Sequence, residues 1–327
     1  MRIETIMRAL ADPTRLRIMR LLAAMELAVG ELAQVLGQSQ PRVSRHVGIL
    51  CDAGLAERHR EGSWVFLRAS VGKERGTPVG EAVARLLATA EREDADFAAA
   101  CAEDRRQLAA IRAARESSAE TYFARHAEVW DELRQLHSPD EQVEAKLVEA
   151  LGDEPLGHVL DIGTGTGRMA ELFAARAERV VALDKSLDML RFARAKLQNL
   201  PSGAVELVQG DFAALPFPAR GFDTVLLHQV LHFAQDPAAP LAEAARVTRP
   251  GGRIAIVDFD AHQREELRDR HAHARLGFTD AAISTLLTEA GFTPAPPIAL
   301  EGGELVVKIW LGTRQGAPAS AGRKAAR

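Results

Sequence analysis

Apolar residues in the first 70 positions recur at three- and four-residue intervals, in blocks that are separated by short breaks. This spacing predicts helices over 3–25, with an interruption at Asp12-Pro13, over 30–37, and over 39–55. The following stretch, 56–70, is typical of two strands joined at Glu61-Gly62. Helix, turn, helix and hairpin in this order predict a mostly α-helical winged helix-turn-helix domain, with the hairpin as its wing.

Turn-forming residues mark the ends of these helices. Gly37 closes the second helix. Ser39 is placed to cap the third helix, Pro41 falls in its first turn, and Gly54 ends it. The third helix therefore has well-defined limits.

Residues 77–137 are rich in alanine, glutamate and arginine and contain few helix breakers. Apolar residues still recur at helical spacing, namely Val79, Val83, Leu86 and Leu87, and further on Phe97, Leu108 and Ile111. The segment therefore predicts one or more long helices that act as a dimerisation element or a connector. The alternative is a solvated spacer helix, which is less favoured because long helices in globular proteins usually pack against an apolar partner.

From Pro155 onward, short apolar runs rich in β-branched residues alternate with helical stretches. The predicted strands cover 158–163, 179–184, 205–211, 222–228 and 253–259. Alternation of this kind predicts an α/β fold with a parallel sheet covered on both faces. The end differs, because 297–313 resembles two strands joined at Gly302-Gly303 and predicts an antiparallel finish to the sheet.

These patterns divide the chain into four segments. They are a DNA-binding domain over 1–76, a helical segment over 77–137, an α/β domain over 138–312 and a disordered basic tail over 313–327. Lys and Arg exceed Asp and Glu by three over 1–70, whereas acids exceed bases by eight over 138–312. The first segment can therefore approach a polyanion, and the large acidic domain is unsuited to it.

Composition excludes several protein classes. No apolar run approaches the ~20 residues that span a bilayer, and the first residues lack the apolar core of a signal peptide. The two cysteines, Cys51 and Cys101, are far apart and form no CxxC motif. We therefore expect a cytoplasmic protein with no membrane association, no disulfide framework and no thiolate metal cluster.

The stretch "LDIGTGTGRMAEL", residues 160–172, carries the clearest chemistry of the α/β domain. Gly163, Gly165 and Gly167 allow a sharp turn and close approach of a ligand to the backbone. A dinucleotide fingerprint needs G-x-G-x-x-G, but Arg168 stands at its third glycine, and no Walker lysine follows. Asp161 would repel a pyrophosphate. It suits a positively charged ligand such as S-adenosylmethionine, which carries ammonium and sulfonium groups.

Two more acids end the next two predicted strands. Asp184 is placed to accept both hydroxyls of a ribose, and Asp211 to accept from an adenine amino group with Phe212 against the ring. Each alone is a common loop aspartate. Together with Asp161 they lie where open α/β sheets bind ligands, at successive strand ends.

With these motifs, residues from about 119 to 312 resemble the class I S-adenosylmethionine-dependent methyltransferases, which have a Rossmann-like sheet with an antiparallel final strand pair. The resemblance rests on D-x-G-x-G-x-G, the second-strand acid, "GD" after the third strand and "RPGGRIAIVDF". It implies a site for S-adenosylmethionine or S-adenosylhomocysteine. Residues assigned to that site by the resemblance are Asp161, Gly163, Thr164, Gly165 and Gly167 around the methionine part, Asp184 and Lys185 at the ribose, Asp211 and Phe212 at the adenine, and His228 near the methyl group.

The third predicted helix of the first domain has a polar and an apolar side. Val43, Val47 and Leu50 fall on the core-facing side. The side expected to be exposed carries residues that can contact bases or phosphates, namely Gln40, Arg42, Ser44, Arg45 and His46. On or near the hairpin lie Arg58, Arg60 and Arg68, of which the first two are the favoured wing contacts.

Residues 9–68 closely resemble the ArsR family of winged-helix repressors, through "ALADPTRLRIMRLL", "GELAQVLGQSQPRVSRHVGILCDAGL" and "RHREGSWVFLR". The resemblance implies a homodimer that binds an inverted repeat in double-stranded operator DNA. It also implies that the first helix and the long helix after the wing form the dimer interface. Metal-sensing members have cysteines where this chain has Ala28 and Gly30, so we expect no metal at this position.

Two functions fit the combination of domains. In the first, the protein is a transcriptional regulator, a repressor by its family resemblance, and S-adenosylmethionine or S-adenosylhomocysteine is its effector. In the second, the α/β domain is an active methyltransferase on a small molecule. Its candidate bases are His228, His232, His271 and His273, none of them distinguished from a packed or surface histidine by sequence alone. A domain that binds nothing is disfavoured by the complete set of three acids, and the sequence favours the regulator.

Overall fold

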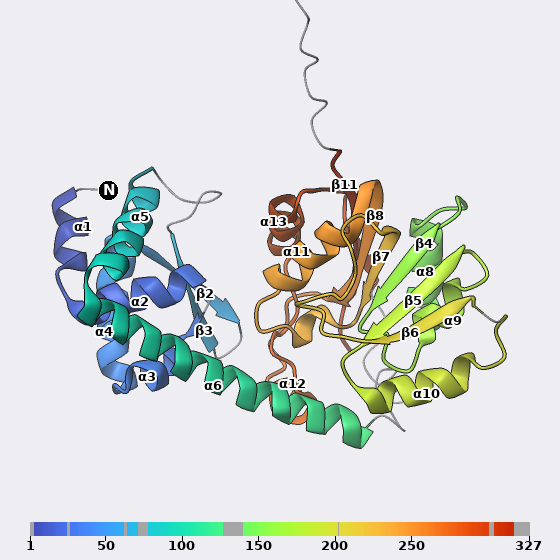
Figure 1. The fold of residues 1–327 in the computed structure, drawn as a ribbon, viewed down its shortest axis with the longest axis horizontal. Coiled ribbons are helices and arrows are strands. Elements are labelled where there is room, and N and C mark those ends of the chain that lie inside the picture. Colours follow the sequence, from blue (N-terminus) through green and yellow to red (C-terminus); the bar gives the residue numbers. More distant parts are fainter. Residues whose placement is uncertain are drawn as a thin grey trace, which may run out of the picture. The chain divides into compact units, whose positions relative to one another are not determined.

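The computed structural model describes residues 3–24, 27–61, 64–70, 78–126, 140–201, 203–300 and 304–316 (Figure 1). The chain divides into two compact units. The first unit comprises Met1–Ala119 with Gln263–Glu265, and the second comprises Glu120–His262 with Glu266–Arg327. Each unit has its own hydrophobic core and is described by itself.

The first unit is a winged helix-turn-helix, as predicted. Its helices are α1 (Ile3–Leu10), α2 (Pro13–Ala24), α3 (Val29–Leu36), α4 (Gln40–Asp52), α5 (Pro78–Glu93) and most of α6 (Ala95–His126). An antiparallel sheet of order β1-β3-β2 is built from β1 (Leu27–Ala28), β2 (Ala56–Glu61) and β3 (Trp64–Ala69). The hairpin β2–β3 forms at the predicted position, whereas the two-residue strand β1 was not predicted, because it is too short to show any alternation of side chains.

The helix ends follow the predicted turn residues with one difference. Gly37 ends α3 in the left-handed region, at φ 61°, and Gly54 lies just beyond α4 at φ 71°. Ser39 is the N-cap residue of α4, but its side chain makes no capping hydrogen bond. The helix therefore begins where the sequence predicts without the expected side-chain cap.

The core of the first unit extends from α2, α3 and α4 into the long helices. Val43, Val47 and Leu50 of α4 are fully buried, which confirms the predicted core-facing side. Leu87 of α5 and Leu108 of α6 belong to the same cluster. These helices therefore pack against the domain and are not solvated spacers over this part of their length.

The second unit is a mixed sheet of order β10-β11-β8-β7-β4-β5-β6, with β9 paired to β11. Its strands are β4 (His158–Ile162), β5 (Arg179–Asp184), β6 (Val205–Gln209), β7 (Phe222–His228), β8 (Thr248–Phe259), β9 (Phe292–Pro294), β10 (Ile298–Leu300) and β11 (Val307–Arg314). The strands β4 to β8 are parallel, and β11 runs antiparallel to β8, β9 and β10. The five predicted parallel strands and the antiparallel finish are therefore confirmed. Gly302 and Gly303, where the turn between these strands was predicted, lie outside the described residues.

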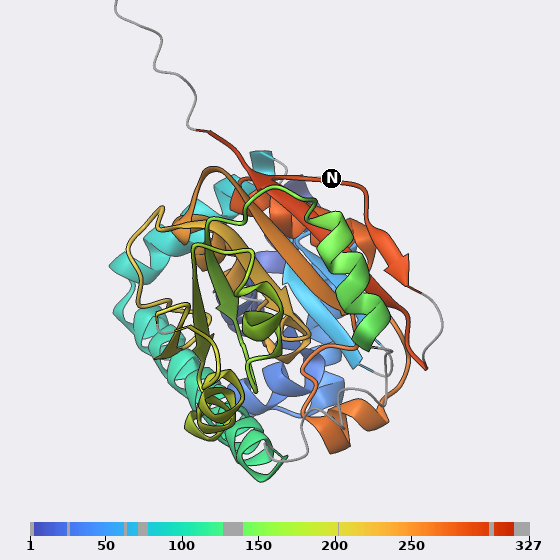
Figure 2. The same ribbon diagram turned by 90° about the vertical axis from the view of Figure 1, so that its right-hand side faces the viewer.

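Helices cover both faces of this sheet. Successive side chains of each strand point to opposite faces, so neighbouring residues pack against different helices. In β4, Val159 packs in a cluster with α8 (Asp140–Ala150), α9 (Arg168–Phe173) and α10 (Leu187–Leu197). Its neighbour Leu160 packs in the opposite cluster, with α11 (Ala238–Val247) and α13 (Asp280–Ala290). Figure 2 shows α8 in front of the sheet. The remaining elements are the 3-10 helix η2 (Leu231–Phe233) and α12 (Glu266–His271).

Candidate functional site

The loop after β4 is a tight glycine turn held on two sides. Gly163, Gly165 and Gly167 all have positive φ, at 71°, 54° and 86°. The N–H groups of Gly163 and Thr164 both donate to the carbonyl of Leu183 on β5, at 2.8 and 2.9 Å. A Cβ on Gly163 would lie 2.3 Å from Cγ2 of Val230, so no side chain fits there. The glycines are therefore required by backbone conformation and, at Gly163, by close packing.

Asp161 is the next-to-last residue of β4, just before this loop. It is 1% exposed, and its Oδ2 accepts a hydrogen bond from the Thr164 hydroxyl at 2.6 Å. This contact ties the carboxylate to the glycine turn. The carboxyl group is thus fixed in place beside the loop.

Asp184, the last residue of β5, forms hydrogen bonds with the loops that follow β4 and β5. Its Oδ2 accepts from the N–H of Gly165 at 2.8 Å, and its Oδ1 accepts from the N–H of Ser186 at 2.8 Å. Burial raises the pKa of Asp184, while the backbone N–H groups act in the opposite direction because they stabilise the carboxylate. Each carboxylate oxygen has a further lone pair, so the side chain can still accept from a ligand.

The other predicted cofactor residues lie at the same edge of the sheet. Asp211 follows β6; its Oδ1 accepts from the N–H of Ala213 at 2.8 Å, and its Oδ2 lies 3.5 Å from Nζ of Lys185. Phe212 packs against the core on the α11 side and His228, at the end of β7, is 8% exposed. The structure therefore brings the predicted residues together along the carboxyl ends of β4, β5, β6 and β7, which are neighbours in the sheet.

Arg168 has a role that the sequence did not reveal. It begins α9 directly after the glycine turn, and its Nε and Nη2 donate to the two carboxylate oxygens of Glu144 on α8, at 2.7 and 2.6 Å. Glu144 is buried, and its hydrogen bond to the guanidinium raises the pKa of Arg168. This bidentate pair fastens α8 to the loop. The one sequence signal for this pair was the arginine itself, which stands where a dinucleotide fingerprint has its third glycine.

The candidate bases differ in burial. His228, His232 and His273 are buried, whereas His271 at the end of α12 is half-buried. His232 lies on η2, just beyond β7, and its Nδ1 is 2.8 Å from Asp258 Oδ1. Sequence reasoning missed Asp258, because it lies 26 positions from His232 and no local pattern joins them.

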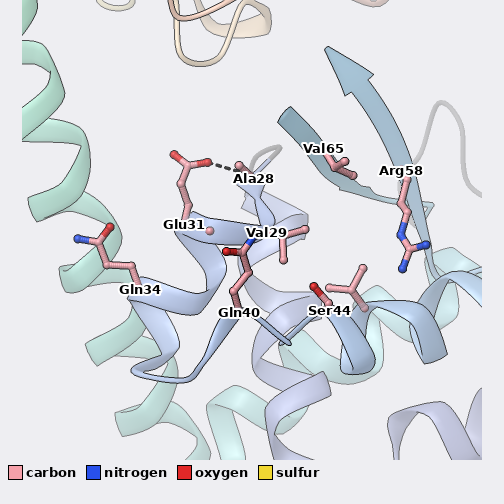
Figure 3. A pocket seen from close by; sticks show the side chains of 10 residues that line it. Ala28, Val29, Glu31, Gln34, Gln40, Ser44, Arg58 and Val65 are labelled. Carbon is pink, nitrogen blue, oxygen red and sulfur yellow. Dashed lines mark hydrogen bonds between the residues drawn. The ribbon is translucent and has the colours of Figure 1, made fainter. Parts of the chain in front are cut away.

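In the first unit, several predicted DNA contacts line one pocket of about 650 Å³ (Figure 3). Gln40 and Ser44 come from α4, and Arg58 comes from β2. The guanidinium of Arg58 lies over the helix, where Nη2 is 3.7 Å from the position of a Cβ on Gly48. Helix and wing therefore present these polar groups to one concave surface.

The other predicted contacts fall into two groups. Arg42 and Arg45 are exposed on α4, and Arg60 lies on β2 in register with Val65 of β3. His46 was predicted to lie on the exposed side of α4, and the structure shows that it does not. Its side chain is 12% exposed, and its Nδ1 lies 3.7 Å from Oδ1 of Asp12, because the turn before α2 packs over that part of α4.

Ala28 and Gly30, at the positions where the resemblance places metal-binding cysteines, also line this pocket. Beside them the buried Glu31 accepts the N–H of Ala28 at 2.6 Å and so caps α3. Within the described ranges, no group of three or more His, Cys, Asp or Glu is arranged to hold a metal ion. The same residues contain no helix that is long and apolar enough to cross a bilayer.

Comparison with known families assigns both units. Residues 12–58 match the family described as bacterial regulatory protein, arsR family, and residues 160–256 match the family described as methyltransferase domain. The chain therefore combines an ArsR-family helix-turn-helix domain with a methyltransferase domain.

Curated relatives match the second unit. A demethylmenaquinone methyltransferase of Renibacterium salmoninarum is 37% identical over 113 residues, covering 35% of this chain and 46% of the relative. A malonyl-[acyl-carrier protein] O-methyltransferase of Serratia marcescens is 32% identical over 165 residues, covering 48% of this chain and 62% of the relative. The chain spans about half the length of most of the curated relatives it matches.

Solved structures support the fold of the same unit. A chain from the complex of the Haloferax volcanii Trm112 methyltransferase activator with a methyltransferase superposes with a TM-score of 0.51 at 20% identity. The match covers 59% of this chain and 98% of that one. The second unit thus has the Rossmann-like fold of the class I methyltransferases.

Gly163 provides a sharp test of the loop. We expect Gly163→Ala to lower the affinity for S-adenosylhomocysteine at least about tenfold, because the added Cβ meets Val230 and displaces the turn. Gly152→Ala is the matched control, since Gly152 also has positive φ but has nothing within 4 Å of an added Cβ. Isothermal titration calorimetry measures both. Equal affinities in the two variants would contradict a binding role for the turn.

Arg45 tests the DNA interface. We expect Arg45→Ala to weaken binding to a duplex selected from random sequence by about 1–3 kcal/mol, the cost of losing a base or phosphate contact. Arg191→Ala, which removes an exposed arginine from α10, serves as the control. Fluorescence anisotropy at two salt concentrations gives both affinities. An unchanged DNA affinity for the Arg45 variant would contradict the prediction that α4 contacts the DNA.

Proposed function

We propose that the protein is a DNA-binding transcriptional regulator, acting as a repressor, whose methyltransferase domain binds S-adenosylmethionine or S-adenosylhomocysteine as effector. The observation that carries the proposal is the presence, in one chain, of a basic recognition helix and a glycine turn with three strand-end carboxylates. A regulator needs both a DNA contact and a ligand site, and the two units supply one each.

The residues at the sheet edge suit a methyl donor in charge and shape. The glycine turn bends the backbone sharply at positive φ, and the carboxyl groups of Asp161 and Asp184 lie beside it. Asp161 and the turn would hold the cationic methionine part, Asp184 and Lys185 the ribose, and Asp211 with Phe212 the adenine. The same carboxylates would repel the pyrophosphate of a dinucleotide.

For the first unit we propose a homodimer bound to an inverted repeat, with α4 of each copy in the major groove. Arg42, Arg45 and Gln40 would contact DNA from the helix, with the wing beside them. Large apolar side chains on two helices support a second copy as partner. Those with high exposure are Ile3 at 60% and Met7 at 55% on α1, and Val79 at 39% and Leu86 at 54% on α5. Such side chains favour burial against a second copy.

Contacts within the second unit lead from the glycine turn to α6. Val230 packs on Gly163, and η2 begins at the next residue. Phe233 of η2 packs edge-to-face with Phe123 of α6, with ring centroids 4.8 Å apart. The same helix contributes Leu108 to the core of the DNA-binding unit. A ligand that reorders the turn can therefore bias α6, to the extent that its affinity differs between the two arrangements.

The effector role predicts a change in DNA affinity. We expect saturating S-adenosylmethionine or S-adenosylhomocysteine to change the affinity for a selected duplex at least about fivefold, the lower end of usual allosteric coupling. Fluorescence anisotropy with each nucleoside measures the change, and calorimetry checks that the nucleoside is bound. Unchanged DNA affinity with both nucleosides bound would refute the effector role.

The aromatic contact offers a separate test of the coupling. We expect Phe123→Ala to abolish most of the nucleoside effect on DNA binding while leaving both separate affinities within about twofold, because it breaks the link and neither site. Phe192→Ala removes a 40% exposed aromatic from α10 and should preserve the effect. Linked anisotropy and calorimetry titrations compare the variants. Full coupling in the Phe123 variant would exclude this route.

The named relatives favour a second candidate function, methyl transfer to a small molecule, because they are methyltransferases. Incubation with methyl-labelled S-adenosylmethionine and a cell extract tests it. Label in any small-molecule fraction would support the enzyme. Tight nucleoside binding without transfer of label would favour the regulator alone.

A further inference from the structure

The pocket of the first unit divides the polar surface of α4 into two parts. Figure 3 shows Gln40 and Ser44, four residues apart on α4, beside the space between that helix and the wing. Arg42 and Arg45 are exposed on α4 but do not line the pocket. One set of polar side chains therefore lies inside a hollow, and the other lies on the open surface of the helix.

Strand alternation places a positive charge in the pocket. Glu57 and Arg58 are adjacent on β2, so their side chains point to opposite faces of the wing. On one face, Oε2 of Glu57 accepts from Nε and Nη2 of Arg68, at 3.0 and 2.7 Å. On the other face, Arg58 lines the pocket and, among the described residues, has no ion-pair partner. Its guanidinium is thus available to an incoming anion.

The pocket also contains one carboxyl group, which is engaged elsewhere. Glu31 is 6% exposed, and its Oε2 accepts the N–H of Ala28 at the start of α3. The N-terminal end of a helix offsets such a negative charge. Arg58 is exposed, and the Ser44 hydroxyl and the Gln40 amide add hydrogen-bond donors. The accessible part of the lining therefore suits an anion.

Shape indicates which part of a DNA duplex such a pocket can receive. The base edges lie at the floor of a major groove about 8.5 Å deep, whereas the phosphates form its rims. An exposed helix face can reach the floor, but a side chain inside a hollow cannot. A hollow can receive a rim, and phosphate oxygens accept hydrogen bonds from arginine, serine and glutamine side chains.

We propose that this pocket binds a backbone phosphate of the DNA, held by Arg58 from the wing and by Ser44 and Gln40 from α4. The proposal rests on the proposed DNA-binding function and assigns a separate task to each part of α4. The pocket residues fix the position of the strand between helix and wing and read no sequence. Arg42 and Arg45, outside the pocket, are the arginines that read base edges. Gln40 is thereby assigned to the backbone, although a glutamine on a recognition helix is suited to adenine.

Neutral phosphate analogues test the contact directly. The probe is a duplex selected from random sequence, carrying a single uncharged methylphosphonate linkage that is moved from position to position. For the full-length wild type we expect one linkage in each half-site to lower the affinity at least about fivefold. Arg58→Ala should bind more weakly and lose less than about twofold at that linkage, because the partner charge is already gone. Arg68→Ala is the matched control, since Arg68 pairs with Glu57 on the other face, and it should keep the full dependence.

Sequence specificity gives an independent measurement. We expect Arg58→Ala to weaken binding to the selected duplex and to a mismatched duplex by the same factor, within about twofold, and to reduce the salt slope by about one. Arg45→Ala should instead lower the ratio of the two affinities. Fluorescence anisotropy at several salt concentrations measures all of these affinities.

Gly30 allows the pocket to be closed without disturbing the fold. An added Cβ there has nothing within 4 Å, and an acid near the start of a helix is favourable. We expect Gly30→Glu to lower DNA affinity at least about tenfold, because it places a negative charge beside the phosphate. Gly30→Gln, which adds the same number of side-chain heavy atoms without the charge, should lose less. Thermal unfolding confirms that both variants fold.

Three results would overturn the assignment. They are a phosphate dependence that persists in full in the Arg58 variant, a lower specificity ratio in that variant, and equal losses for Gly30→Glu and Gly30→Gln. If the wild type binds DNA but shows one of these results, only the role of the pocket fails. If no duplex can be selected with the wild type, the DNA-binding function fails and the phosphate site fails with it.

Discussion

The chemistry of the second unit depends on the parallel alignment of β4 to β8, because parallel strands bring all their carboxyl ends to one edge. That edge gathers four carboxylates, and carboxylates placed together repel one another unless donors stabilise them. Each has such donors: a threonine hydroxyl at Asp161, backbone N–H groups at Asp184, and the ring and backbone of His232 at Asp258. Asp211 accepts a backbone N–H and faces Lys185. Donors therefore hold each carboxyl group in place at this edge, while burial raises the pKa of Asp184.

The segment from Val230 to Phe233 connects three features of that edge. It packs on the glycine turn at one end, presents His232 to Asp258 in the middle, and meets α6 through Phe233. Packed side chains shift between discrete arrangements more readily than they deform. A molecule bound beside the turn would thus lie next to the few residues that α6 touches, whether it is a signal or a substrate.

Local pattern predicted most of the fold. Helical spacing located α4 and its buried side, and alternation of strands and helices located β4 to β8 with the residues at their ends. The features that local pattern missed depend on contacts between residues that are far apart in the sequence. β1 exists only because Leu27 pairs with Leu67 of β3, and His46 is covered because the turn at Asp12 packs on α4. The pairs Arg168–Glu144 and His232–Asp258 likewise join residues more than 20 positions apart. The three strand-end acids were predictable because the alternation of strands and helices predicts a parallel sheet, and a parallel sheet brings its strand ends to one edge.

The charge of the edge also bears on which nucleoside the regulator would detect. Methyl transfer removes the sulfonium charge, so the donor is more cationic than the product by one unit while their shapes differ by one methyl group. Shape alone separates two ligands poorly at the level of one methyl group. A fixed negative charge in a water-poor site separates them well, because Coulomb interactions are strong where the dielectric constant is low. Asp161, which is 1% exposed and tied to the turn through Thr164, is the carboxyl group placed to supply such a charge in the proposed nucleoside site. Under that proposal the ionised form of Asp161 would favour the donor over the product, whether the domain consumes the donor or only detects it.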